Sequence, residues 1–460
     1  MTYEDFLERK VAVGQTDGIE LRSHNPALFP YQVDVLRYLL KIGRGAAFLD
    51  TGLGKTLLQL EWARCVVEYT GKPVLVLTPL AVARQTEREG AKFDLDVQVV
   101  ADQSGVTRAA IYVTNYEKLP HFDAAAFGGV VLDESSILKA FTGTTKRRLC
   151  ETFRATPYRL ACTATPAPND YMEIGNHSEF LGIMPGPEML SRFFINDTMN
   201  FGTYRLKGHA VKPFWQWVAS WAVAMSKPSD LAYSDEGFIL PPLNVQRHYV
   251  SVDLTQDTGD LLFRIPEMSA TSVHREKRLS AESRAAKLAG IVSAESSEPW
   301  IVWCETNYEA DALKSVMPEA CELRGDENEK AKESKLLAFS SGDERVLITK
   351  PKIAGFGMNW QHCARVGFMG LTFSYEQFYQ AVRRSWRFGQ SRPVDCHVVL
   401  ASTERQIWSV VEAKMAQHDE MKARMCRENF SRTVRHYSIK ESYKPTVAMR
   451  LPSFLRGAAS

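Results

Sequence analysis

The sequence lacks any pair of cysteines in a C-x-x-C spacing, although it contains eight cysteines among its 460 residues. Its histidines and cysteines show no metal-ligand spacing either, so we expect no structural zinc. Several cysteines stand inside apolar runs, which is typical of small buried hydrophobic side chains. This pattern argues against a secreted, disulfide-bonded protein and favours a reducing, cytoplasmic compartment.

Long apolar runs and a signal sequence are also missing. No apolar run is long enough to span a bilayer, and the stretch from Met1 to Lys10 is charged and has no apolar core. We therefore expect no membrane partner. Short-period repeats and low-complexity segments are absent, which excludes a repeat architecture. With hydrophobic residues at 45% and charged residues at 24%, the composition is that of a globular chain with two or three domains.

The chain has no large excess of charge of one sign, since its formal net charge is +2. A basic composition is therefore not what would suggest a nucleic-acid partner. The charge is uneven, however, because residues 421–460 contain nine lysines or arginines and two glutamates, a local charge of +7 that leaves −5 for the rest. Such a tail could attract phosphate groups regardless of base sequence, or it could be a solvated terminus, and both interpretations stay open.

What the chain does contain is an alternation of short apolar runs and helical patterns. This alternation predicts the α/β class, in which a mainly parallel sheet is flanked by helices. Helices are predicted between the strands, including one over 374–387 and a long final helix from Ser402 to about residue 427. The runs that we expect to form strands are 46–50, 74–78, 111–114, 130–133, 158–162, 300–304, 320–323, 346–349 and 395–400.

The alternation breaks once, which indicates two lobes. Residues 182–240 are rich in glycine, proline and aromatic side chains, and the stretch Leu240-Pro241-Pro242 is typical of a hinge or linker. We therefore expect a first lobe over 1–240, whose part from 182 is irregular or helical. A second lobe over 241–428 and a basic tail over 429–460 would follow.

The strongest local motif is Asp50-Thr51-Gly52-Leu53-Gly54-Lys55-Thr56, which follows an apolar strand and opens a helix. The two glycines allow backbone N–H groups to turn around phosphate oxygens, and the helix N-terminus adds partial positive charge. Lys55 would place its ammonium between the β- and γ-phosphates, and the Thr56 hydroxyl would ligate Mg²⁺. We therefore predict a nucleotide-binding loop formed by Thr51, Gly52, Leu53, Gly54, Lys55 and Thr56.

Two carboxylates, Asp133 and Glu134, follow the apolar run 130–132. A P-loop ATPase needs one carboxylate to hold Mg²⁺ and another to orient or deprotonate the attacking water. We assign Asp133 to the metal and Glu134 to catalysis. Thr163 and Thr165 follow a later strand and could hydrogen-bond the acidic pair to sense the nucleotide, although an ordinary strand-end turn would have the same pattern.

Arginines stand at the end of the helix predicted over 374–387. Arg384 and Arg387 are three residues apart and therefore lie on one helical face, whereas Arg383 is displaced by one step. An arginine supplied across a cleft stabilises the charge of a phosphoryl-transfer transition state, but a solvated basic helix end would show the same pattern. The glycines of 355–359 would allow the backbone to approach a ligand closely.

In motif order and spacing, the chain from about Leu28 to Glu412 resembles the superfamily 2 helicases, and within these it is most similar to Snf-type ATP-dependent translocases. The resemblance implies two RecA-like P-loop lobes with an ATP cleft between them. It also implies that Gln32 recognises the adenine base. Its other implied roles are catalysis by Gln380, Arg384 and Arg387, coupling by Thr163, Thr165 and Gly357, and nucleic-acid contact by Thr78, Pro79, Thr114, Asn115 and Asn359.

The implied activity is that of a DNA helicase or translocase, a nucleic-acid-dependent ATPase that uses ATP and Mg²⁺ and contacts mainly the phosphates of double-stranded DNA. An RNA-directed helicase and a non-motor nucleic-acid-binding subunit of a restriction or replication complex remain alternatives. Ser136 stands where many relatives have histidine, and Thr86 where the Snf group often has tryptophan. The compact size is similar to that of helicases encoded by bacteriophages, which would act in the host cytoplasm.

Overall fold

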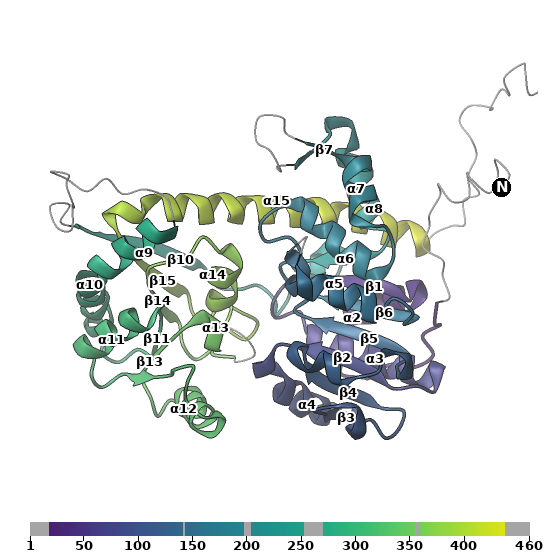
Figure 1. The fold of residues 1–460 in the computed structure, drawn as a ribbon, viewed down its shortest axis with the longest axis horizontal. Coiled ribbons are helices and arrows are strands. Elements are labelled where there is room, and N and C mark those ends of the chain that lie inside the picture. The colour runs from purple at the N-terminus through teal and green to yellow at the C-terminus, as the bar shows by residue number, and fades with distance from the viewer. Residues whose placement is uncertain (1–17, 141–142, 197–203, 253–269, 355–358, 438–460) are drawn as a thin grey trace, which may run out of the picture.

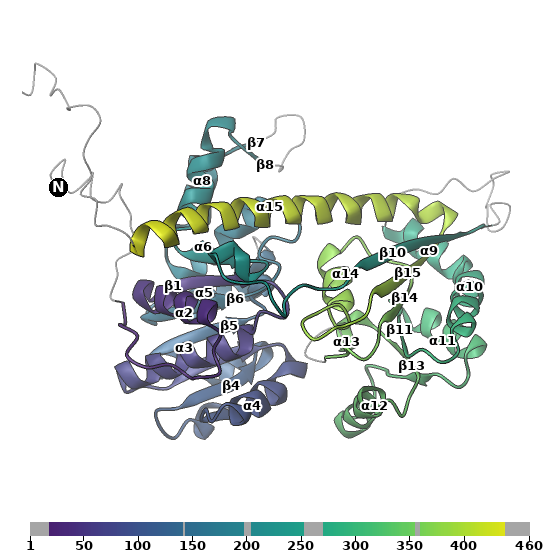
Figure 2. The same ribbon diagram turned by 180° about the vertical axis from the view of Figure 1, so that it is seen from behind.

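A computed structural model describes residues 18–140, 143–196, 204–252, 270–354 and 359–437. Two α/β lobes lie side by side, and the long helix α15 (Arg405–Tyr437) runs along both of them (Figures 1 and 2). No helix in this described part combines the length and apolar character needed to cross a bilayer. All eight cysteines are free thiols and six of them are buried, as expected for small core side chains.

The first lobe is built on a seven-stranded parallel sheet in the order β3-β4-β2-β5-β6-β1-β9. Its central strands are apolar along their whole length because helices cover both faces of the sheet. The strands are β1 (Arg44–Leu49), β2 (Val74–Thr78), β3 (Val97–Val99), β4 (Ile111–Asn115), β5 (Gly129–Asp133), β6 (Tyr158–Cys162) and β9 (Ala222–Met225). The covering helices are α2 (Pro30–Ile42), α3 (Lys55–Thr70), α4 (Ala83–Lys92), α5 (Thr144–Thr152) and α6 (Ile174–Leu181).

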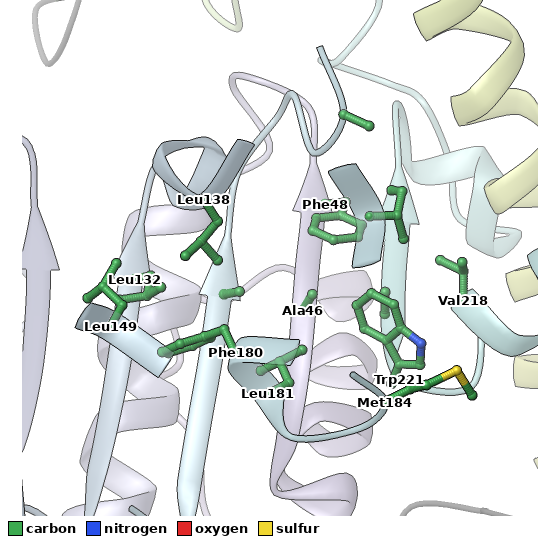
Figure 3. Packing of buried hydrophobic residues seen from close by; sticks show 14 of the residues in the cluster. Ala46, Phe48, Leu132, Leu138, Leu149, Phe180, Leu181, Met184, Val218 and Trp221 are labelled. Atoms are coloured by element: carbon green, nitrogen blue, oxygen red, sulfur yellow. The ribbon is translucent and has the colours of Figure 1, made fainter. Parts of the chain in front are cut away.

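The segment that we expected to be irregular or helical contains a strand of the main sheet. Helices α7 (Gly186–Phe193) and α8 (Val211–Val218) flank a small antiparallel hairpin of β7 (Phe194–Asn196) and β8 (Tyr204–Leu206). Strand β9 then pairs with β1, so the prediction was incomplete here. Four residues without apolar–polar alternation are too short a signal for the sequence pattern to detect. Figure 3 shows Trp221, just before β9, packed beside Phe48 of β1 and near Val218 of α8.

The second lobe has a six-stranded parallel sheet in the order β10-β15-β14-β11-β13-β12. Its strands are β10 (Leu243–Val250), β11 (Trp300–Trp303), β12 (Cys321–Glu322), β13 (Val346–Thr349), β14 (Arg365–Met369) and β15 (Val394–Ala401). Its helices before α15 are α9 (Ala270–Leu279), α10 (Ala281–Ala294), α11 (Asn307–Val316), α12 (Glu329–Ser341), α13 (Pro351–Ala354) and α14 (Tyr375–Val382). The boundary that we predicted at residue 240 lies between β9 and β10.

Two helix ends differ from the sequence-based expectation. Helix α14 ends at Val382, so Arg384 and Arg387 lie in the turns after it and not on one helical face. Helix α15 continues to Tyr437, about ten residues beyond the expected end, so the predicted basic tail begins inside this helix. Residues 438–460 lie outside the described part of the chain.

Helix α15 supplies side chains to the cores of both lobes. Ile407 and Val411 near its start pack with the second lobe, whereas Met421 and Met425 near its end pack with the first. Because these apolar positions face different lobes, the helix connects the two lobes and does not belong to the second alone.

Candidate nucleotide site between the lobes

The predicted phosphate loop connects the end of β1 at Leu49 to the start of α3 at Lys55. Gly52 and Gly54 have φ values of 95° and 71°, a region that favours glycine. A side chain at Gly54 would also have no room, since an added Cβ would lie 2.3 Å from Gln32 Nε2. The loop therefore has the backbone shape for which its glycines were expected.

The half-buried Lys55 donates hydrogen bonds from its ammonium to carbonyl oxygens of its own loop. Its Nζ lies 3.0 Å from the Leu49 oxygen and 3.3 Å from the Asp50 oxygen. Burial lowers the pKa of Lys55, and the carboxylates of Glu134, Asp50 and Asp133 oppose this shift. The lysine thus lies among negative groups, and its contact with a phosphate stays a prediction.

Gln32 supports the loop from helix α2. Its Nε2 donates to the carbonyl oxygens of Leu53 at 3.0 Å and Gly54 at 3.2 Å, while its Oε1 accepts the Phe29 N–H at 2.8 Å. The neighbouring Tyr31 hydroxyl also donates to Leu53, at 3.2 Å. The amide of Gln32 therefore holds the loop in this structure, and its recognition of a base stays a prediction.

The acidic pair lies where β5 ends. Asp133 is the last residue of the strand, and Glu134 follows it with φ 53° and ψ 54°, a left-handed conformation that is uncommon for a residue with a side chain. Glu134 Oε2 accepts the Thr163 hydroxyl at 3.3 Å, and Thr163 Oγ1 accepts the Thr165 N–H at 3.1 Å. The two predicted coupling threonines are thus connected to the predicted catalytic carboxylate.

The electrostatics of the pair indicate a shortage of positive charge. Burial raises the pKa of Asp133 to about 7, helped by the charge of Glu134 and opposed by Lys55. Burial also raises the pKa of Glu134, against the charges of Lys55 and Arg384. A buried carboxylate and a half-buried one beside one ammonium form an environment that an added divalent cation would neutralise.

The second lobe reaches this acidic pair through α14 and the turn after it. Gln380 Nε2 lies 3.5 Å from Glu134 Oε2, and Arg384 Nη2 lies 3.5 Å from Gln380 Oε1. Burial and the nearby Arg387 lower the pKa of Arg384 to about 9, while Glu134 and Asp133 oppose that shift. The guanidinium therefore remains a cation at neutral pH and faces the carboxylates across the lobe boundary.

Arg387 lies differently from Arg384. Its guanidinium donates to the side-chain oxygen of Asn359. Burial and the charge of Arg383 lower the pKa of Arg387 to about 10. The next residue, Phe388, lies close to the phosphate loop, since a Cβ added at Gly52 would be 3.0 Å from Phe388 N. Sequence reasoning did not single out Phe388, and its position directly after Arg387 was the available signal.

The residues predicted to contact nucleic acid are mostly covered. Thr78 and Thr114 are 0% and 1% exposed at the ends of adjacent strands, and the side chain of Asn115 accepts the Lys118 N–H at 3.1 Å. Asn359 is exposed, whereas Gly357 lies outside the described residues. Nucleic-acid contact by these residues, including the half-buried Pro79, stays a prediction.

Comparisons with known proteins match parts of the chain. A family model for the helicase conserved C-terminal domain matches residues 283–389, a range that contains Gln380, Arg384 and Arg387. Eukaryotic initiation factor 4A of Dictyostelium discoideum is 30% identical over 125 residues, which cover 26% of this chain and 30% of that protein. The match thus spans less than a third of that relative.

A solved SWI2/SNF2 ATPase core of Sulfolobus solfataricus in complex with double-stranded DNA aligns over 90% of this chain and 96% of its own, with a TM-score of 0.43 and 17% identity. A similarity this low does not transfer the bound DNA or a function. The family match is therefore limited to residues 283–389 of the second lobe, which match the helicase conserved C-terminal domain. The two parallel-sheet lobes agree with the fold that the resemblance to superfamily 2 helicases implied.

Proposed function

We propose that the protein is a nucleic-acid-dependent ATPase that works as a helicase or translocase on double-stranded DNA. This proposal depends on one observation, namely that side chains of the second lobe lie close to the Glu134 carboxylate of the first lobe. Gln380 of the second lobe lies 3.5 Å from Glu134 of the first, and Arg384 lies next to Gln380. A site that needs both lobes can link a chemical step to their relative position.

Each residue has a distinct role in this proposal. The loop N–H groups and Lys55 hold the phosphates, Glu134 orients or deprotonates the attacking water, and Arg384 stabilises charge on the transferring phosphoryl group. Thr163 connects Glu134 to the rest of the first lobe. Asp133 and Thr56 would hold Mg²⁺, which supplies positive charge toward the phosphate oxygens when bound.

Movement along nucleic acid would follow from closure of the lobes. Binding of ATP between Lys55 and Arg384 favours the closed arrangement, and its hydrolysis removes that preference. A strand held by both lobes is advanced if its affinity for them differs between the open and closed states. Contacts to phosphates would make the binding dependent on salt and largely independent of base sequence.

The first test is ATP turnover in the presence of nucleic acid. We expect Lys55→Ala and Glu134→Gln to abolish stimulated turnover, and Arg384→Ala to lower kcat by about 10³-fold or more, as removal of an arginine finger does. Replacement of Lys72, an exposed lysine of the same lobe, by alanine is the matched control and should leave turnover unchanged. Wild-type turnover in either of the first two variants would refute the assignment of the site.

The choice of DNA depends on the motif resemblance, and the similarity to an initiation factor keeps an RNA substrate as the second candidate. Stimulation of turnover by duplex DNA, single-stranded DNA and RNA separates the two, and greater stimulation by RNA would reverse our choice. A strand-displacement assay on the best substrate then distinguishes unwinding from translocation. Binding of nucleic acid without any ATP turnover would favour the non-motor alternative.

A further inference from the structure

Asp50, the first residue of the phosphate loop, is 6% exposed and has cationic partners that the nucleotide site does not use. Its Oδ2 lies 2.7 Å from Arg383 Nη2 and 3.1 Å from Lys422 Nζ. Its Oδ1 accepts the Thr51 N–H at 2.7 Å and the Tyr379 hydroxyl. Burial would raise the pKa of Asp50, but Arg383 and Lys422 together lower it to about 2, so the side chain is ionised.

The two cations, Arg383 and Lys422, belong to parts of the molecule that pack on different lobes. Arg383 follows α14 in the second lobe and directly precedes Arg384. Lys422 lies in the part of α15 that packs on the first lobe, where the adjacent Met421 enters the core and the Cys426 thiol lies 3.4 Å from the Ala224 oxygen. If the lobes part while this end of α15 remains on the first lobe, Lys422 stays with Asp50 and loses its 3.4 Å contact with the Tyr379 hydroxyl, whereas Arg383 leaves with its own lobe.

Each member of the inter-lobe pair has a substitute partner on its own side. A buried carboxylate without a cation is strongly unfavourable, and Lys422 prevents that state at Asp50. Arg383 in turn lies over the ring of Trp386, at 4.4 Å from the ring centre, within the second lobe. The ion pair between Asp50 and Arg383 can therefore break and form again without leaving either charge alone.

Apolar packing is incomplete at this point of the interface. Asp50, Arg383 and Lys422 line a cavity of about 1020 Å³ whose other walls come from both lobes and α15, among them Val245 and Met415. Because side chains do not fill this space, the lobes make fewer apolar contacts there, and the ion pair between Asp50 and Arg383 is a specific contact that remains at its wall.

We propose that the Asp50–Arg383 ion pair is a reversible connection between the lobes that positions Arg384 at the nucleotide site, and that Lys422 retains Asp50 when the connection breaks. Arg383 and Arg384 are adjacent in the turn after α14. An ion pair that fixes Arg383 therefore also fixes the Arg384 guanidinium beside Gln380, which in turn lies beside Glu134. Asp50, Arg383 and Lys422 act as positioning residues in this proposal, because it assigns none of their side chains a contact with the nucleotide. The inference rests on the proposed ATPase for its purpose, although the connection itself does not need turnover.

The test measures the distance between the lobes in the full chain without nucleotide. Fluorescent dyes on non-native amino acids replace the exposed Lys72 of the first lobe and Glu319 of the second, and single-molecule energy transfer reports opening. We expect Arg383→Gln to shift the population toward open molecules, because Asp50 then has no cation across the interface and keeps only the Tyr379 hydroxyl as a partner there. We expect Lys422→Gln to shift it toward closed molecules, because opening would then leave Asp50 without a cation.

Arg383→Gln and Lys422→Gln each remove one positive charge. A general loosening of the structure would shift both variants toward open molecules and would not give opposite shifts. Arg424→Gln is the matched control, since it removes a charge of α15 that pairs with Glu420 on the surface. Arg383→Lys should restore part of the closed population. Shifts in the same direction, or an unchanged distance in a folded Arg383→Gln protein, would overturn the proposal.

Turnover supplies a second, separate readout. We expect Arg383→Gln to lower kcat by about tenfold or more through the misplaced Arg384, while KM changes less, as for an interaction made in the transition state. An unchanged kcat in this variant would also overturn the positioning role. A wild-type protein without ATPase activity would refute the proposed function, whereas opposite distance shifts in the two variants would still support the connection.

Discussion

Glu134 has a left-handed backbone, with φ 53° and ψ 54°, although it is not a glycine. Conformations of this kind cost on the order of 1 kcal/mol and persist only where the surroundings enforce them. Here the strained turn directs the carboxylate toward Thr163 and Gln380. The strain lies at the residue to which we assign the attacking water, and this agrees with a functional reason for it.

His177 is the residue for which the structure gives a pH prediction. Its ring is completely buried, its Nε2 lies 2.9 Å from the Pro166 oxygen, and burial lowers its pKa from 6.5 to about 4. The folded state therefore keeps the ring neutral while the unfolded chain takes up a proton as the pH falls through 6.5. The stability contributed by His177 is present above that pH and is lost between about 6.5 and 4, by about 3 kcal/mol in total.

Urea unfolding of the wild type and of His177→Gln at several pH values in this window measures the effect. The glutamine amide can still donate to Pro166 but does not titrate, so the variant should lose less stability on acidification. Other groups titrate in both proteins, and the difference between the two curves isolates the histidine. Parallel curves would show that His177 is not the responsible group.

At the scale of elements, the residue at which α14 ends determines where the arginines after it lie. The helix stops at Val382, and the turns after it send neighbouring arginines to different partners. Arg383 pairs with Asp50, Arg384 lies beside Gln380, and Arg387 donates to Asn359. A helix continued through these residues would have separated them by helical spacing instead, so the early end of α14 allows Arg383 to reach Asp50 of the first lobe while Arg384 stays beside Gln380.

Helix α10 is held in the second lobe by Arg284, which is 0% exposed. Its guanidinium donates to Glu309 of α11 at 2.9 Å and to the Met369 oxygen of β14 at 3.0 Å. We expect Arg284→Met to cost about 3–5 kcal/mol, because it leaves the Glu309 carboxylate buried without its cation. Chemical denaturation followed by circular dichroism measures this cost.

The matched control is Arg147→Met, which removes an exposed arginine that pairs with Glu151 one helical turn away. Surface pairs of this kind contribute little, so the unfolding midpoint should not change. Equal destabilisation by the two substitutions would contradict the assigned role of the Arg284 network.

At the scale of the whole molecule, α15 decides whether the two lobes behave as one. Its apolar residues enter both cores, and its Lys414 donates to Asn169 of the first lobe at 2.9 Å and to the Phe373 oxygen of the second at 2.9 Å. A continuous helix therefore transmits the stability of each lobe to the other. We expect the wild type to unfold in a single calorimetric transition.

Ala416 is an exposed residue near the middle of α15, between the parts that pack on each lobe. Ala416→Pro should break the helix there at a cost of about 3 kcal/mol or more and separate the unfolding of the lobes into two transitions. Ala416→Gly is the control, with an expected cost of about 1 kcal/mol and a single transition. A single transition in the proline variant would mean that the direct contacts between the lobes suffice to couple them.

Local sequence patterns were sufficient for the α/β class, for the phosphate loop and for the acidic pair at the end of β5. These features depend on short-range rules, namely continuous apolar strands, glycines where φ is positive, and polar residues at strand ends. The same patterns missed the short strands β3 and β9 and the half-exposed edge strand β10, which do not resemble a buried central strand. They also missed β14, although it is a buried strand in the middle of the second sheet.

The contacts between the lobes depended on the assembled fold. From spacing alone, Arg383 was set aside and Lys422 was counted with a basic tail, yet both meet Asp50, more than 300 residues away in the chain. The sharing of α15 between the two cores was equally absent from its helical pattern. Long-range pairing is set by the packing of whole elements, and no local pattern specifies which distant carboxylate a buried cation will meet.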